Sequence, residues 1–190
     1  INSMEEVISV KYCEDLGRTE GMENLMRAEL KQSVEISKEQ FKRNFYTTSS
    51  CGVCGKASID SIKVTCSPLS REAIQVKKEV LFGLPDKLRT AQDVFKHTGG
   101  LHAAGLFDVA GKLIDHHEDV GRHNAADSIA GRMWLQGLVG DNKIFYTTGR
   151  LTSEIVMKTA FMGIPTLLSR SGVTQMGLEL AQEIGMTMIA

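Results

Sequence analysis

Helical patterns and short apolar runs alternate from Pro85 to the end of the chain, and this order is the strongest constraint on the fold. Apolar residues at helical spacing predict helices over 85–97, 123–136, 153–162 and 174–184. Short apolar runs predict strands over 103–109, 112–115, 143–147, 165–168 and 186–189, the first two forming a hairpin. Such an alternation predicts an α/β fold, a layered mixed sheet with helices on both faces.

Residues 1–68 have a less regular pattern than the remainder of the chain. They contain one predicted strand over 7–13 and a second over 34–36, and Ser37 begins a capping-box pattern typical of a helix start. Polar stretches rich in Glu and Lys separate these segments. We therefore predict two parts, an N-terminal portion over 1–68 and an α/β core domain over 69–190.

The N-terminal portion carries two cysteines at CxxC spacing, Cys51 and Cys54. Thiols at this spacing form half of a zinc site, cycle between dithiol and disulfide, or carry sulfur as a persulfide. Gly52 and Gly55 allow backbone N–H groups to approach a reacting sulfur. The positive charge of Lys56 favours the thiolate, which is the nucleophilic form. These neighbours favour a reactive site.

The surrounding sequence ranks the three chemistries. A zinc site needs two further ligands, and the chain has no second CxxC. A thioredoxin-type site begins a long helix after its CxxC, whereas residues 57–66 are rich in β-branched side chains and read as extended. Sulfur carriage is therefore favoured, with zinc binding and redox cycling as the alternatives.

Composition excludes several other classes of protein. The chain has 190 residues, 42% of them hydrophobic, and a net charge of −1, enough for a sizeable core but without the basic block of a nucleic-acid binder. Its apolar runs are too short to span a bilayer. The first four residues lack the basic and apolar regions of a signal peptide. We expect a cytoplasmic protein with reduced thiols and no membrane or nucleic-acid partner.

Three glycine-bearing clusters, residues 98–102, 116–124 and 147–150, lie where predicted strands and helices meet. Glycine permits close approach of a ligand, and helix N-termini offer N–H groups to phosphate. Arg122 and Arg150 can hold a phosphate through the guanidinium fork, and Glu118 or Asp119 can accept from a ribose or base. Together the clusters predict a nucleotide-sized pocket.

Structural roles explain the same residues as an alternative. Gly99-Gly100 is typical of a helix C-cap, and Asp119 can cap the helix that follows it. The adjacent His116 and His117 point to opposite faces of a strand, so they do not form a metal pair. We predict no tightly held metal.

The assembled strings resemble the FdhD family, the accessory sulfurtransferases required for active formate dehydrogenases. The resemblance is carried by Cys51-Gly-Val-Cys-Gly-Lys-Ala57, Thr98-Gly-Gly-Leu-His-Ala-Ala104 and Glu118-Asp-Val-Gly-Arg-His-Asn-Ala125. It extends in order from about residue 40 to the end of the chain. It implies a fold similar to that of cytidine deaminases, and a homodimer.

The resemblance also implies a reaction. Cys51 accepts sulfur from a cysteine desulfurase as a persulfide, and Cys54 assists. The sulfur passes to the molybdenum or tungsten of the bis(molybdopterin guanine dinucleotide) cofactor, a bound client that is inserted into formate dehydrogenase. The resemblance implies that the three glycine-bearing clusters bind the guanine nucleotide of this cofactor. The implied site residues are Gly100, His102, Asp119, Arg122, His123, Asn124 and Arg150.

Two other functions stay open at this point. One is a zinc-binding, deaminase-like hydrolase, although the chain lacks the deaminase zinc set of His/Cys-x-Glu and Pro-Cys-x-x-Cys. The other is a non-enzymatic chaperone that inserts the cofactor without carrying sulfur.

Overall fold

The computed structural model describes residues 4–12, 26–35, 69 and 74–190. The chain divides into two compact units, residues 1–52 and 53–190. Cys51 and Cys54 lie outside the described residues, as do the CxxC loop and the helix start predicted at Ser37.

The described part of the first unit is a two-stranded ribbon. A 3-10 turn, η1 (Met4–Glu6), leads into β1 (Val7–Tyr12), which pairs antiparallel with β2 (Met26–Leu30). The strand predicted over 7–13 is confirmed as β1. The strand predicted over 34–36 is wrong at Val34 and Glu35, which are irregular. The partner strand instead lies in a segment whose charged side chains hid it from a search for apolar runs.

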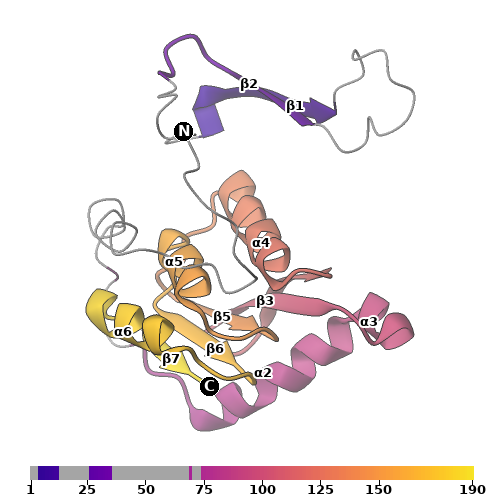
Figure 1. Ribbon diagram of the computed structural model, residues 1–190, viewed down its shortest axis with the longest axis vertical. Coiled ribbons are helices and arrows are strands. Elements are labelled where there is room, and N and C mark those ends of the chain that lie inside the picture. The colour runs from indigo at the N-terminus through magenta and orange to yellow at the C-terminus, as the bar shows by residue number, and fades with distance from the viewer. Residues whose placement is uncertain (1–3, 13–25, 36–68, 70–73) are drawn as a thin grey trace. The chain divides into compact units, whose positions relative to one another are not determined.

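The second unit contains a five-stranded mixed sheet in the order β4-β3-β5-β6-β7 (Figure 1). β3 is antiparallel to both of its neighbours, whereas β5, β6 and β7 are parallel. The predicted hairpin and mixed sheet are therefore confirmed. The strands are β3 (His102–Asp108), β4 (Leu113–Asp119), β5 (Lys143–Thr147), β6 (Thr166–Ser169) and β7 (Thr187–Ile189).

Five helices accompany this sheet in the described part of the unit: α2 (Lys78–Ala91), α3 (Asp93–Thr98), α4 (Arg122–Gln136), α5 (Ser153–Phe161) and α6 (Gln175–Ile184). The last three lie close to their predicted bounds. The single helix predicted over 85–97 is wrong: α2 begins earlier, contains Pro85, and is separated from α3 at Gln92. The predicted helix began at Pro85, whereas α2 contains this proline internally, where its ring nitrogen has no N–H to donate to the helix. No helix among the described residues is both long and apolar enough to cross a bilayer.

Side chains of the central strands point alternately to the two faces of the sheet, and on both faces they are apolar. Helices therefore pack against both faces. Phe145 packs in the core cluster that contains α4, α5 and α6. Its neighbours Ile144 and Tyr146 pack in a second cluster, which contains Leu84 and Leu88 of α2. The predicted covering of both faces is confirmed. The likeness to cytidine deaminases stays a prediction.

Candidate functional site

The three glycine-bearing loops meet at one end of the sheet. β3 begins at this end, whereas β4, β5 and β6 finish there, because β3 runs antiparallel to β4 and β5. His102 at the start of β3 is paired with Asp119 at the end of β4. Thr147 at the end of β5 is paired with Ala104. The topology therefore places the predicted site residues around a single edge.

Thr148 ties the first loop to the third. Its Oγ1 accepts a hydrogen bond from the backbone N–H of Ala103 at 2.9 Å and lies 3.3 Å from Nδ1 of His102. Its own backbone N–H donates to the carbonyl of Ala103 at 3.0 Å. The predicted site residue His102 is thus held by a threonine that was not among the residues predicted for the site.

The second loop contacts the third through Arg122 and Gly149. Gly149 is buried, and its backbone lies against the side chain of Arg122 so closely that a Cβ would overlap it. Arg150 follows at an exposed position. The structure therefore brings the two predicted phosphate-binding arginines to adjoining loops.

Asp119 organises the turn into α4. Its Oδ1 accepts from the backbone N–H of Gly121 at 2.7 Å and from Nδ2 of Asn124 at 3.0 Å. The N-cap of α4 is Gly121, so the alternative interpretation of Asp119 as the cap residue is wrong. Asp119 and Asn124 instead hold each other, which fixes the loop that presents Arg122.

Glu118 has a structural task that the sequence patterns did not predict. Its Oε2 accepts from the backbone N–H of Val94 at 2.9 Å, and its Oε1 accepts from that of Phe95 at 2.8 Å. The carboxylate therefore caps the first turn of α3 from the neighbouring strand.

The interpretation of Gly99 as a C-cap is confirmed, since it ends α3 with φ 67°. At the predicted site residue Gly100, an added Cβ would meet a single described atom within 4 Å, the carbonyl oxygen of Thr98 at 3.8 Å. Among the described residues, nothing crowds the space beside the Gly100 backbone that a ligand would enter.

His123 joins the first turns of α4 and α5. Its Nε2 lies 3.1 Å from Oε2 of Glu154, and one turn further Lys158 pairs with Asp127 at 2.5 Å. Burial lowers the pKa of His123, and the positive charge of Arg122 acts in the same direction, against the carboxylate of Glu154. The ring is therefore neutral at pH 7 and donates its Nε2–H to Glu154. Nδ1 is left as a buried acceptor with no hydrogen-bond partner in the described chain.

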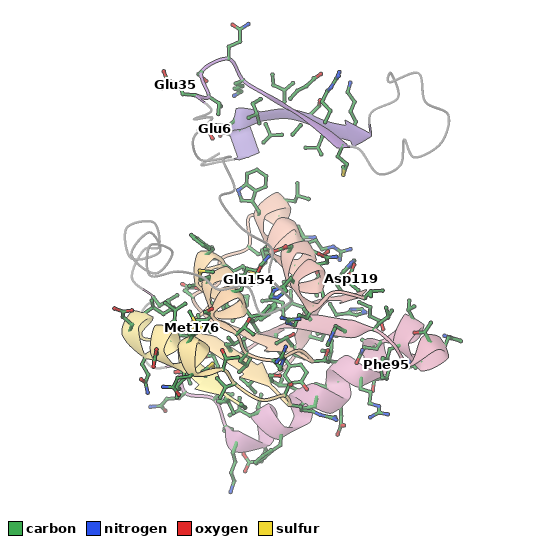
Figure 2. All side chains as sticks on the ribbon, viewed as in Figure 1. Glu6, Glu35, Phe95, Asp119, Glu154 and Met176 are labelled. Atoms are coloured by element: carbon green, nitrogen blue, oxygen red, sulfur yellow. The ribbon has the colours of Figure 1, made fainter. Side chains whose placement is uncertain are left out.

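A cavity of about 310 Å³ lies at the same end of the sheet, on the face covered by α2. Two polar residues in its wall are almost fully buried, Gln92 at 4% exposure and Tyr146 at 3%. Burial raises the pKa of the Tyr146 hydroxyl, which stays protonated and able to donate. Figure 2 shows Phe95 near α2 and α3, and Asp119 and Glu154 near α4 and α5. The lining residues are Pro85, Arg89, Gln92, Phe95, Leu101, Tyr146, Thr148, Arg170 and Ser171.

The cavity wall combines groups that suit a ring bearing an anionic substituent. Arg89 and Arg170 supply positive charge, and neither forms an ion pair within the described part of the chain. Phe95 offers an aromatic surface, and the Gln92 amide offers both a donor and an acceptor. The predicted glycine-bearing clusters contribute Leu101 and Thr148 to this wall. The sequence patterns did not predict the part supplied by α2, α3 and residues 170–171. A usable signal was Arg170, which follows a predicted strand, where binding loops gather.

The described residues contain no group of three or more His, Cys, Asp and Glu side chains that could hold a metal ion. His116 is partly buried, whereas its neighbour His117 is exposed, on the opposite face of β4, as strand alternation requires. Since the CxxC cysteines lie outside the described residues, the expectation of no tightly held metal stays a prediction.

Fold and site together define an α/β protein whose mixed sheet gathers polar loops and a cavity at one end. The model of the FdhD/NarQ family matches residues 1–190, and the chain belongs to this family. The resemblance seen in the sequence strings is thereby confirmed.

Several relatives carry the name sulfur carrier protein FdhD. The chain is 44% identical over 151 residues to that of Streptomyces avermitilis, covering 78% of this chain and 54% of the relative. It is 41% identical over 169 residues to that of Streptomyces coelicolor, covering 87% and 60%. The chain is 38% identical over 190 residues to that of Saccharolobus solfataricus, covering 100% of this chain and 67% of the relative. The chain thus spans little more than half the length of the first two relatives.

A crystal structure of a putative formate dehydrogenase accessory protein from Desulfotalea psychrophila is also similar. It superposes with a TM-score of 0.69 at 26% sequence identity, covering 99% of this chain and 65% of the other. The fold is therefore shared with an experimentally determined structure.

Proposed function

We propose that this chain carries sulfur on Cys51 for the maturation of formate dehydrogenase. The observation that carries the proposal is the family match over residues 1–190, which includes Cys51 and Cys54. Relatives named as sulfur carrier proteins, and a structural neighbour named for a formate dehydrogenase accessory role, support it.

The chemical step is a thiol exchange. The Cys51 thiolate attacks the outer sulfur of a cysteine desulfurase persulfide, a new S–S bond forms, and the desulfurase cysteine leaves as a thiolate. This loading step needs no external oxidant or reductant. Cys54 assists by relay or exchange. In the exchange route its thiolate attacks the inner sulfur of the Cys51 persulfide, a Cys51–Cys54 disulfide forms, and sulfide leaves for the molybdenum or tungsten of the bis(molybdopterin guanine dinucleotide) substrate; a cellular thiol then reduces the disulfide.

In this proposal, the guanine nucleotide end of that substrate binds at the end of the sheet where the three glycine-bearing loops meet. Arg122 and Arg150 lie on adjoining loops, where they can pair with its phosphates. Nδ1 of His123 offers a buried acceptor. The cavity on the α2 face, with Arg89 and Arg170 in its wall, adds space for the base and further positive charge.

Sulfur loading is tested by mass spectrometry after incubation with a cysteine desulfurase and isotopically labelled cysteine. We expect a sulfur adduct that is absent from Cys51→Ala and reduced, but present, in Cys54→Ala. An unchanged adduct in Cys51→Ala would refute the assignment. Normal activation of formate dehydrogenase after replacement of both cysteines would indicate a cofactor chaperone instead.

Nucleotide binding is tested separately by calorimetry with GDP. Arg122→Ala and Arg150→Ala should each weaken binding, because each removes a charge-assisted contact to phosphate. ADP serves as the specificity control. Equal affinity for ADP would rule out guanine recognition, and the absence of any binding would rule out the nucleotide site.

A further inference from the structure

The helix α3 depends on another element for its N-terminal capping. The residue at its N-cap is Gln92, whose side chain makes no capping hydrogen bond. The first N–H groups of a helix lack partners within the helix, so they need acceptors from elsewhere. Glu118 of β4 provides them, with one oxygen on Val94 N–H at 2.9 Å and the other on Phe95 N–H at 2.8 Å.

This external cap fixes two parts of the cavity wall. Phe95, which lines the cavity, is bonded through its backbone directly to the carboxylate. Gln92 lines the same cavity and is 4% exposed. Its side chain does not cap α3, and its side-chain amide makes no hydrogen bond in the described part of the chain. The carboxylate therefore holds Phe95 directly, and it can act on Gln92, the N-cap residue of α3, through the first turn of that helix.

We propose that Glu118 is a positioning residue for ligand binding in this cavity, acting through α3 on Phe95 and Gln92. Within the described part of the chain, the hydrogen bonds that Glu118 accepts come from two backbone N–H groups, so its proposed role needs no direct contact with the ligand. The ligand class is a planar ring with an anionic substituent, which the aromatic, amide and arginine groups of the wall would receive. Its identification as a guanine nucleotide rests on the proposed function.

The carboxylate is required because both of its oxygens accept. In Glu118→Gln, one oxygen becomes an NH₂ group that faces a backbone N–H donor, so one of the two hydrogen bonds is lost. The negative charge at the N-terminus of α3 disappears as well, which removes a favourable interaction with the helix dipole. The first turn of α3 should therefore shift and carry Phe95 and Gln92 with it.

The matched control is Asp93→Asn, which removes a carboxylate from the same helical turn. Asp93 pairs with Lys96 at 2.9 Å, its side chain is 83% exposed, and it is absent from the cavity lining. With GDP as the probe, we expect Glu118→Gln to weaken binding about tenfold, the effect of losing one charged hydrogen bond and the alignment it maintains. Asp93→Asn should change the affinity by less than about twofold.

A double-mutant cycle separates positioning from general loss of stability. If Glu118 acts through Phe95, then Glu118→Gln should weaken GDP binding far less in a Phe95→Ala background than in the wild type. Equal effects in the two backgrounds would overturn the proposal, as would wild-type affinity in Glu118→Gln itself.

Absence of GDP binding would refute only the assignment of the ligand as a nucleotide. NMR spectroscopy tests the positioning role of Glu118 without a ligand. In ¹H–¹⁵N spectra of the full chain, Glu118→Gln should move the backbone amides of Val94 and Phe95 and the side-chain amide of Gln92. The signals of α6 should stay in place. An unmoved Gln92 side-chain signal would refute the positioning role.

Discussion

Arg122 and Gly149 pack so tightly that only glycine fits between their loops. A Cβ placed on Gly149 would lie 2.6 Å from Cδ of Arg122 and 2.8 Å from its Cβ. Both distances are shorter than the contacts that real side chains make, and the Arg122 Cβ is fixed by α4. The approach of the two loops therefore depends on the missing side chain.

Gly149→Ala should displace Arg122 and lower the free energy of unfolding by about 1–3 kcal/mol, because the added methyl overpacks a filled contact. GDP binding should weaken at the same time. Chemical denaturation and calorimetry measure the two effects.

Gly131→Ala is the control for this substitution. Outside its own helix backbone, no atom of the described residues lies within 4 Å of the position that its Cβ would take in α4. Helix propensity should therefore raise stability by up to about 1 kcal/mol. Equal outcomes for the two variants would contradict the packing argument.

The N-caps of α5 and α6 form a natural pair for comparison. Thr174 Oγ1 accepts from the Gly177 N–H at 3.2 Å, whereas the Thr152 hydroxyl makes no capping bond and is buried without a partner among the described residues. Thr174→Val should therefore cost about 1 kcal/mol of stability. Thr152→Val should be neutral or stabilising, because it removes an unsatisfied buried hydroxyl. Thermal and denaturant unfolding measure the stability of the two variants. A larger loss of stability in Thr152→Val than in Thr174→Val would show that the Thr152 hydroxyl has a hydrogen-bond partner.

The lowered pKa of His123 makes stability depend on pH. The folded state holds the proton less tightly than the unfolded chain, whose histidine titrates near 6.5. Its stabilising contribution is thus present above pH 6.5 and is lost as pH falls through 6.5 toward the folded pKa. We expect His123→Gln, which does not titrate, to lose less stability than the wild type between about pH 7.5 and about pH 5.5. Parallel curves in denaturant titrations would show that the ring protonates equally in both states.

Packing on the α2 face is tested by two substitutions on one helix. Leu84 is fully buried at 0% exposure, whereas Phe82 is 79% exposed. Leu84→Ala should cost about 2–5 kcal/mol through lost burial and the cavity it leaves. Phe82→Ala should change stability by less than about 0.5 kcal/mol. A large loss at Phe82 would show that this ring is covered in solution.

The sequence predicted elements whose signals are local. The apolar run over 143–147 coincides with β5, and the predicted helices over 123–136 and 174–184 match α4 and α6 to within one residue at each end. Residue alternation and helical spacing are properties of short windows, so they are readable without a structure. The pocket predicted from the three glycine-bearing clusters required their loops to converge, and the observed strand order brings them to one edge of the sheet.

The parts of the fold and of the candidate site that the sequence did not predict depend on contacts between distant segments. Glu118 and the N–H groups that it caps are separated by more than twenty positions, and no pattern in either segment announces their pairing. No sequence pattern therefore indicated that Glu118 caps a helix. Gln92 and Tyr146 were missed for the same reason, because their shared cavity exists only after α2 folds over the sheet.

Only Gly99, Gly100 and Leu101 separate the end of α3 from the start of β3. So short a connector has little slack, and β3 is hydrogen-bonded on both sides. A displacement of α3 would therefore be transmitted as tension to the backbone around His102. Occupancy on one face of the sheet could then be sensed at residues on the other face, with β3 serving as the mechanical link between them.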